Sequence, residues 1–199
     1  TQLALAIATA LAKLFNINTP TPKLSLAMGR MKRTSVGTTI FQQGGFVIDA
    51  GKTFKNKTIN PESIPPQIFH QSFPEDWKFV IAIPNTKKGL AKTQEKNAFN
   101  KLPPMPPQTA AKICWLTLMK LAPALIEQDI KNFGDALTQI QTTVGNYFST
   151  VQNGTYSSQT AKTAITLMKS SGAHGIGQSS WGPTIYGLAP NQTKAKKLL

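Results

Sequence analysis

The first fifteen residues of the chain carry apolar side chains at helical spacing. These positions lie one, three or four residues apart and comprise Leu3, Ala6, Ile7, Ala10, Leu11 and Leu14. The period predicts an amphipathic helix over residues 1–15 with this apolar stripe buried. Asn16 and the segment NTPTP that follows are typical of a helix end.

Three more helices are predicted further along the chain. An apolar run over residues 108–122 predicts a helix that is broken or kinked at Pro123. Residues 127–149 predict a long helix, and residues 159–170 a shorter one. The core face of the long helix is expected to comprise Phe133, Leu137, Ile140, Val144 and Phe148.

Strand patterns are fewer and shorter. The continuous apolar run at 77–84 predicts a strand covered on both faces, and the segment GPTIYGL predicts another near the end of the chain. Residues 38–41 and 46–49 are expected to pair as short strands across two glycines, Gly44 and Gly45. Residues 51–76 are expected to be irregular. This mixture of strands and helices indicates an α+β fold.

The charge balance favours anionic partners. The chain has 22 Lys and Arg against 8 Asp and Glu, a net charge of +14. There is no aromatic ladder between its lysine runs, which argues against binding of single-stranded nucleic acid and leaves solvated surface as the simpler interpretation. The single cysteine, Cys114, excludes an internal disulfide and is expected in the core of a protein from a reducing compartment.

Targeting and membrane signals are not evident in the sequence. The apolar N-terminal run has no basic segment before it, so a signal peptide is rejected. No uninterrupted stretch of 18 apolar residues occurs, so no membrane span is expected.

The segment GRMKRTSVGTT, residues 29–39, is one candidate binding site. Its arginines, hydroxyls and glycine are suited to a phosphate, the candidates being Arg30, Arg33, Ser35, Gly37 and Thr38. The alternative is a turn with solvated arginines.

The segment GAHGIGQSSWGPT, residues 172–184, is the second. Its glycines predict either a tight turn or a backbone cradle for an anion, and it matches no Walker or Rossmann pattern. The candidate binding residues are Gly175, Gly177, Gln178, Ser179, Ser180 and Trp181.

Carboxylates and histidines are scarce. Asp49 lies in an otherwise apolar strand, where it is either functional or held by a structural ion pair or hydrogen bond. Glu127 and Asp129 are explained by the dipole of the helix that they precede. His70 and His174 have no partner at metal-ligand spacing, which argues against zinc.

Six segments in order give the chain a family resemblance over nearly its whole length. They are TQLALA, GGFVIDAGK, FPEDWKFVIAIP, LMKLAPALIEQDIKNFGDALTQIQ, YFSTVQNGTY and GIGQSSWGPTIYGL. Together they resemble the β-ribofuranosylaminobenzene 5′-phosphate synthase family, which has the fold of the GHMP kinase superfamily.

This resemblance implies a two-lobed α+β fold. Residues 1–72 would be the remainder of a lobe like ribosomal protein S5 domain 2, and residues 73–199 a ferredoxin-like lobe. A phosphate loop would normally precede TQLALA, so the chain looks N-terminally truncated and is expected to be inactive or feebly active.

The implied reaction joins phosphoribosyl pyrophosphate to 4-aminobenzoate or 4-hydroxybenzoate, with release of pyrophosphate and carbon dioxide, in methanopterin biosynthesis. Arg30 and Arg33 would bind phosphate or carboxylate, residues 175–180 would supply backbone and side-chain contacts, and Trp181 would orient the aromatic ring. Asp49 would stabilise the cation-like ribose carbon or help to hold Mg²⁺ on pyrophosphate. The resemblance places the protein in the cytoplasm with a homodimer as its candidate assembly.

Two other functions compete with this one. An ATP-dependent small-molecule kinase shares the fold, but Gly37 and Thr38 occupy the region where many such kinases carry an aspartate base. A basic nucleic-acid-binding module is supported only by the charge and the S5-like topology, and is not expected.

Overall fold

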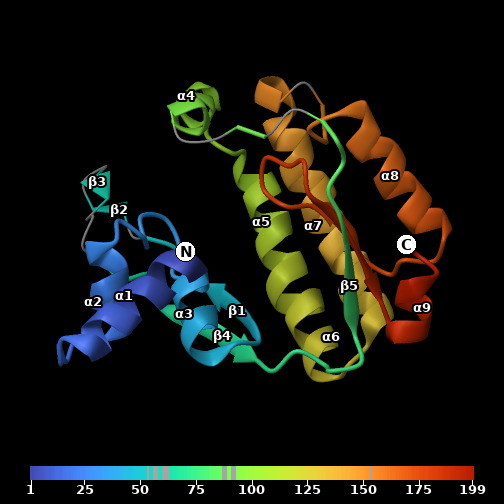
Figure 1. The fold of residues 1–199 in the computed structure, drawn as a ribbon. Helices are drawn as coiled ribbons and strands as arrows, with labels where there is room; N and C mark the ends of the chain where they lie inside the picture. The colour runs from blue at the N-terminus through green and yellow to red at the C-terminus, as the bar shows by residue number, and fades with distance from the viewer. Residues whose placement is uncertain (53, 56–57, 60–62, 87–88, 91–92, 153) are drawn as a thin grey trace. The chain divides into compact units, whose positions relative to one another are not determined.

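A computed structural model describes residues 1–199 except 53, 56–57, 60–62, 87–88, 91–92 and 153 (Figure 1). The chain divides into two compact units, Thr1–Phe73 and Pro74–Leu199.

The described residues of unit 1 form three helices and two small antiparallel sheets. Its elements are α1 (Gln2–Leu14), α2 (Thr21–Ala27), α3 (Val36–Gln43), β1 (Phe46–Asp49), β2 (Phe54–Lys55), β3 (Thr58–Ile59) and β4 (Gln67–Gln71). β1 pairs with β4, β2 pairs with β3, and α3 contacts both α1 and β1. The expectation that residues 51–76 are irregular is wrong, because β2, β3 and β4 form there. The partner of β4 is the distant strand β1, so its pairing leaves no local signal in the sequence.

The N-terminal helix forms as predicted, but its buried face is not the predicted one. Leu5, Ala8 and Ala12 are buried, whereas Leu3 is 75% exposed. The other large residues of the predicted stripe, Ile7, Leu11 and Leu14, are exposed as well. Nearly every position of this helix is apolar, so the spacing of apolar residues alone could not show which face is buried. The small alanines allow α2 and α3 to approach closely.

The predicted strand at 38–41 is wrong, because these residues belong to α3. The helix follows Ser35 and ends at Gly44, which has a positive φ of 66° that only glycine adopts without strain. The β-branched residues of α3 favour strand by propensity, and tertiary contacts override that preference. The second predicted strand forms as β1.

Unit 2 is an antiparallel sheet between helices (Figure 1). Its strands are β5 (Lys78–Ala82), β6 (Ile176–Gln178) and β7 (Ile185–Ala189), in the order β5-β7-β6. Its helices are α4 (Thr93–Lys101), α5 (Pro107–Trp115), the π-helix η1 (Leu116–Leu121), α6 (Ala122–Ile126), α7 (Ile130–Gln152), α8 (Gln159–Ser170) and α9 (Gln192–Lys196).

The two faces of this sheet are covered differently. Val80, Ile176 and Ile185 form a core with residues of α8 and α9, while α7 contacts β6. Phe79 and Ile81 of β5 remain exposed, so the expectation of a strand covered on both faces is wrong. β5 is an edge strand, and α7 covers the other end of the sheet.

The helical run Pro107–Ile126 passes through Pro123 without a break. The widened turns of η1 precede α6, and Pro123 stands in the first turn of α6, where a missing N–H costs little. Cys114 is exposed on this run, contrary to the expected core position. Against expectation, the 20 residues Pro107–Ile126 are long and apolar enough to cross a membrane, and 28% of an 18-residue stretch within them is buried. A single helix of this kind is weak evidence for a membrane span, because core helices of soluble proteins have the same length and composition.

The predicted helices 127–149 and 159–170 are confirmed as α7 and α8. Asp129 begins α7, since its Oδ1 accepts a hydrogen bond of 3.0 Å from the Asn132 amide. Glu127 ends α6 instead of preceding α7 directly. Ser158 begins α8 by accepting a hydrogen bond of 3.1 Å from the Ala161 amide.

Candidate functional site

The carboxylate of Asp49, at the end of β1, lies at the start of α3 and contacts the first candidate segment. Its Oδ2 accepts hydrogen bonds from the Ser35 amide at 2.5 Å, the Ser35 hydroxyl at 3.0 Å and the Thr34 hydroxyl at 2.6 Å. Its Oδ1 accepts one from the Gly51 amide at 3.1 Å. Asp49 therefore takes the place that a bound anion would have at this helix N-terminus.

These contacts keep Asp49 ionised. Partial burial raises the pKa of the carboxyl, but the hydrogen bonds from Thr34, Ser35 and Gly51 together lower it below its ordinary value. A carboxyl with a lowered pKa is a weak base, so it is better suited to stabilising positive charge than to removing a proton.

The remaining residues of this segment divide into buried and exposed groups. Thr38 is buried and its hydroxyl lies 2.6 Å from that of Ser25, a residue that is fully buried. Gly37 lies against Thr1, and its carbonyl accepts a hydrogen bond of 3.0 Å from Gln2. The arginines, Arg30 and Arg33, are exposed. Of the five candidate residues in this segment, Arg30 and Arg33 are the two with exposed side chains, and their neighbours Lys32 and Thr34 are exposed as well.

The second candidate segment is a hairpin formed by β6, a tight loop over residues 179–184, and β7. The Ser179 amide donates to the Thr184 carbonyl at 2.8 Å, and the Gly182 amide to the Ser179 carbonyl at 3.0 Å. Ser180 and Gly182 have positive φ. The sequence left open whether these glycines form a tight turn or a backbone cradle for an anion. The two hydrogen bonds favour the tight turn, because they engage two of the loop's amides.

Gln178 ties this loop to the segment before α8. It is buried, its Oε1 accepts a hydrogen bond of 2.7 Å from the Ser157 amide, and its Nε2 donates to the Ser180 carbonyl at 2.9 Å. Both ends of the amide are thereby engaged in holding the fold.

Trp181 lies in an aromatic cluster with Phe99 of α4 and Phe148 of α7. Its ring centroid is 5.5 Å from that of Phe99 and 4.7 Å from that of Phe148. Only 6% of the residue is exposed. These contacts give Trp181 a packing role, and they leave little of its surface for the substrate ring that the sequence assigned to it.

The glycines of the hairpin allow close packing on α7. A Cβ on Gly175 would lie 3.0 Å from the Cα of Gly134. A Cβ on Gly177 would lie 2.6 Å from the Gln141 side chain and 2.4 Å from the Tyr186 hydroxyl. Any side chain at Gly177 would displace the two side chains that pack over it.

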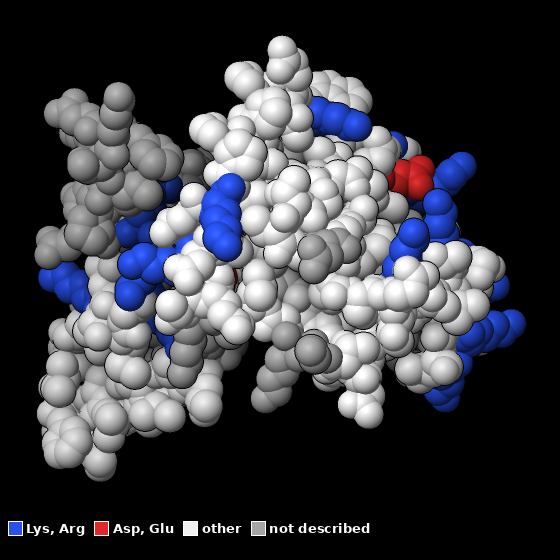
Figure 2. Space-filling view, turned by 90° about the horizontal axis from the view of Figure 1, so that it is seen from above, with Lys and Arg blue, Asp and Glu red and all other residues white. Residues whose placement is uncertain are grey.

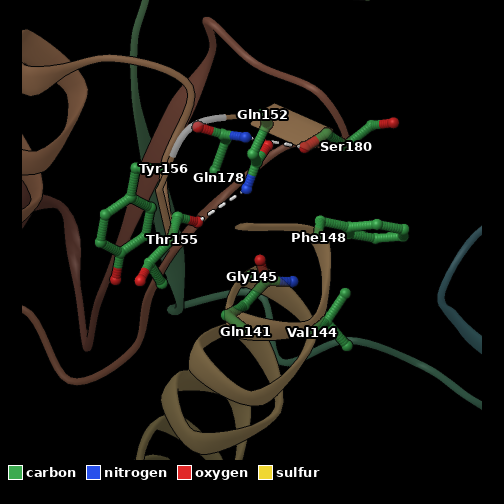
Figure 3. A pocket seen from close by; sticks show the side chains of 9 residues that line it. All are labelled: Gln141, Val144, Gly145, Phe148, Gln152, Thr155, Tyr156, Gln178 and Ser180. Carbon is green, nitrogen blue, oxygen red and sulfur yellow. Dashed lines mark hydrogen bonds between the residues drawn. The ribbon is translucent and has the colours of Figure 1, made fainter. Parts of the chain in front are cut away.

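A cavity of about 150 Å³ opens beside this hairpin (Figure 3). It is lined by Gln141, Val144, Gly145, Phe148, Gln152, Thr155, Tyr156, Gln178 and Ser180. Burial and the nearby Tyr156 hydroxyl raise the pKa of Tyr186, which packs under Gly177. The tyrosine next to the cavity therefore remains a neutral hydroxyl at physiological pH.

The structure thus gathers the candidate residues into two groups, one at α3 in unit 1 and one at the hairpin in unit 2. Sequence reasoning missed Thr34 and Gly51 beside Asp49, although a Thr-Ser pair before a helix is a capping signal. It also missed Gln141, Gln152 and Tyr156, which line the cavity. These residues belong to no recognisable sequence motif, so the sequence gives no signal for them.

Among the described residues, no group of three His, Cys, Asp or Glu side chains is arranged to hold a metal ion. Basic side chains stand in separate groups on the face shown in Figure 2, with few acidic ones.

Two comparisons define the class of protein. Residues 121–199 match the family model described as GHMP kinases C terminal. The fold is similar to that of homoserine kinase from Cytophaga hutchinsonii, with a TM-score of 0.58 and 17% identity over 98% of this chain and 56% of that one. The chain therefore has the α+β fold of the GHMP kinase superfamily, as predicted.

Over nearly its whole length the chain is similar to enzymes named β-ribofuranosylphenol 5′-phosphate synthase, which confirms the resemblance seen in the sequence. It is 32% identical to the enzyme of that name from Methanothermobacter thermautotrophicus and 36% identical to that from Archaeoglobus fulgidus, in each case over 94% of this chain and 58% of the relative. It is 31% identical to that from Methanocaldococcus jannaschii over 99% of this chain and 60% of the relative. The chain thus spans less than two thirds of the length of these relatives.

Proposed function

We propose that the protein transfers the phosphoribosyl group of phosphoribosyl pyrophosphate to 4-hydroxybenzoate or 4-aminobenzoate. The product is a β-ribofuranosyl 5′-phosphate of phenol or aniline, formed on the path to methanopterin. The observation that carries this proposal is the identity of 31–36% to synthases of a β-ribofuranosylphenol 5′-phosphate along at least 94% of the chain.

The proposed reaction replaces one carbon substituent of the ring by another. The bond between ribose C1 and pyrophosphate breaks, and C1 becomes cation-like. The ring carbon that bears the carboxylate attacks C1, and loss of carbon dioxide returns the bonding electrons to the ring. The site must therefore bind phosphates, exclude water from C1 and orient a flat ring.

The exposed arginines are suited to binding the phosphates, and the ionised Asp49 is suited to stabilising the cation-like ribose carbon. Arg30 and Arg33 present guanidinium groups, which bind phosphate oxygens in pairs. The Asp49 carboxylate is held negative by its hydrogen bonds and would stabilise positive charge at C1.

Mg²⁺ fits this site only as an ion carried by pyrophosphate. Three hydrogen bonds already reach Oδ2 of Asp49, so Oδ1 is the oxygen with room for a further partner. Mg²⁺ commonly joins one carboxylate with several phosphate oxygens and waters, where it neutralises their charge. We therefore propose that Asp49 would supply at most one ligand.

Release of labelled carbon dioxide tests the proposed function. The chain, and a form extended to the length of its relatives, are incubated with phosphoribosyl pyrophosphate and carboxyl-labelled 4-hydroxybenzoate or 4-aminobenzoate. We expect labelled carbon dioxide and a product with the mass of the phosphorylated riboside from the extended form. Arg30→Ala should reduce the rate, while Lys23→Ala, at an exposed cation in unit 1, should not.

The result that would overturn this function is phosphate transfer from ATP to a small metabolite without use of phosphoribosyl pyrophosphate. That outcome would support the kinase alternative, for which the fold is the only support. A cytoplasmic location and a homodimer are part of the same proposal. Sedimentation of the extended form at the mass of a single chain would contradict the dimer.

A further inference from the structure

The cavity in unit 2, defined by the nine residues of Figure 3 and called here the glutamine cavity, is polar without being charged. No Lys, Arg, Asp, Glu or His is among the described residues that line it. A phosphate or carboxylate placed inside would lose its water without gaining an opposite charge. The cavity is therefore unsuited to the anionic groups that the arginines of unit 1 would bind.

Its polar groups are arranged around a common space. In Figure 3, Gln152 and Gln178 lie on one side of the cavity, and Gln141 and Gly145 of α7 lie on the other. Gln178 is fully engaged, and Nε2 of Gln152 donates to the Thr155 carbonyl at 3.0 Å. Among the described residues, neither the Gln141 amide nor the Oε1 of Gln152 has a hydrogen-bond partner.

Glycines hold the walls of the cavity in place. A Cβ on Gly145 would lie 2.5 Å from the Thr155 carbonyl, so the loop approaches the helix backbone directly. The stem of Gln141 packs on Gly177, as described above. The walls are therefore set by backbone packing of α7, β6 and the loop before α8, which favours a cavity that exists before its ligand arrives.

The size and the apolar part of the lining indicate an aromatic ring. A cavity of about 150 Å³ is comparable to the engineered protein cavity that accepts benzene. Phe148, Val144 and Tyr156 supply apolar surface for the faces of a ring. The amides supply a donor and an acceptor for one polar substituent on its edge.

We propose that the glutamine cavity binds the uncharged hydroxyl or amino end of the aromatic substrate. This inference rests on the proposed function. A para-substituted benzoate with its hydroxyl or amino group at the amides would keep its carboxylate at the mouth of the cavity, in water. The ring carbon that exchanges carboxylate for ribose would then lie at the open end, where a second substrate can approach it.

Binding of simple rings to the whole chain tests this inference without turnover. Phenol, aniline and benzene are titrated into the labelled chain, and side-chain amide and backbone signals are followed by NMR. We expect saturable binding of phenol and aniline in the millimolar range that a single ring permits, with the largest shifts at Gln141 and Gln152. Benzene, which has no polar edge, should bind at least about fivefold more weakly because the amides stay unpaired.

Variants identify the cavity as the place of binding. Gln141→Leu and Gln152→Leu should each weaken phenol binding at least about fivefold, by the loss of one hydrogen bond. Gln139→Leu, an exposed glutamine on the same helix, is the matched control and should bind as the parent does. If a leucine variant fails to fold, Val144→Phe fills the cavity from its apolar side and should abolish binding.

The outcomes separate this inference from the proposed function. Phenol binding that Gln152→Leu weakens, together with no release of labelled carbon dioxide from 4-hydroxybenzoate by the extended form, supports the cavity and overturns the function. Release of carbon dioxide with an unchanged KM for 4-hydroxybenzoate in Gln141→Leu and Gln152→Leu overturns the cavity and supports the function. Equal binding of benzene and phenol also overturns the cavity as a site that recognises the polar end.

Discussion

The Asp49 carboxylate lies directly on the Ser35 amide, with 2.5 Å between Oδ2 and the nitrogen, across a sequence separation of 14 residues. The last residue of β1 thus supplies the negative charge at the start of α3. Because the same oxygen also accepts from the Ser35 hydroxyl, a single carboxylate joins the helix, the preceding loop and the strand.

Removing the charge of Asp49 should destabilise unit 1. For Asp49→Asn we expect a loss of about 1–2 kcal/mol in the free energy of unfolding at pH 7, at the low end for charged hydrogen bonds because water screens a half-buried group. Urea titrations followed by circular dichroism measure this loss. Asp76→Asn, at an exposed carboxylate, is the control and should change stability by less than about 0.5 kcal/mol.

The hydrogen bonds between Asp49 and Ser35 should also make the free energy of unfolding depend on pH. The hydrogen bonds hold the pKa of Asp49 below its ordinary value, so on acidification the unfolded chain takes up a proton first. The stabilisation is present above the unfolded pKa of about 3.9 and is lost as the pH falls below it. The stability difference between the parent and Asp49→Asn should therefore shrink between pH 5 and pH 3, and a constant difference would refute the assignment.

The hydroxyls of Ser25 and Thr38 should be energetically coupled. Both residues are almost completely buried and their oxygens are 2.6 Å apart, so removing one leaves the other without its partner. Each of Ser25→Ala and Thr38→Val should cost about 1–3 kcal/mol in the free energy of unfolding. The double variant should cost at least about 0.5 kcal/mol less than the sum, measured by urea titration; strict additivity would contradict the bond.

Trp181 should matter for folding at least as much as for turnover. Trp181→Ala removes a ring that is 6% exposed from a three-ring cluster, and we expect a loss of about 3–5 kcal/mol in the free energy of unfolding. Trp115→Ala removes a ring that is 58% exposed, and should cost less than about 1 kcal/mol. Equal losses in thermal or urea unfolding would show that Trp181 is not packed as described.

Gln178 should hold the loop before α8 in place. Gln178→Leu removes the acceptor of the Ser157 amide and the donor to Ser180, at an expected cost of about 1–3 kcal/mol in unfolding free energy. Hydrogen exchange of the Ser157 amide should accelerate by at least tenfold, on the order of one lost hydrogen bond. Gln159→Leu, at an exposed glutamine in α8, is the control; unchanged exchange at Ser157 in the Gln178 variant would exclude this role.

The regular helices of unit 2 could be predicted because their signals are local. The long α7 repeats apolar residues every three or four positions, and Asp129 and Ser158 mark the starts of α7 and α8. The face of α1 could not be predicted in this way, because its small residues, Ala8 and Ala12, pack as well as its large ones. Helix propensity and period carry no information on which side a neighbour approaches.

The site was harder to predict because its contacts join distant positions. Asp49 meets Ser35, and Gln178 meets Ser157 across 21 residues, without any spacing that the sequence could display. The glycine-rich segment near residue 180 was recognised as important, but the choice between a tight turn and an anion cradle depended on where its amides point. That direction is set by the pairing of β6 with β7.

The close packing of glycines between α7 and the hairpin also governs how this chain can change by mutation. A Cβ on Gly134 would lie 2.2 Å from the His174 carbonyl, so a single substitution there forces two backbones apart. Neighbouring surface positions of α7 have no such restriction. Over evolutionary time we expect the exposed positions of α7 to change more often than the glycines packed between α7 and the hairpin.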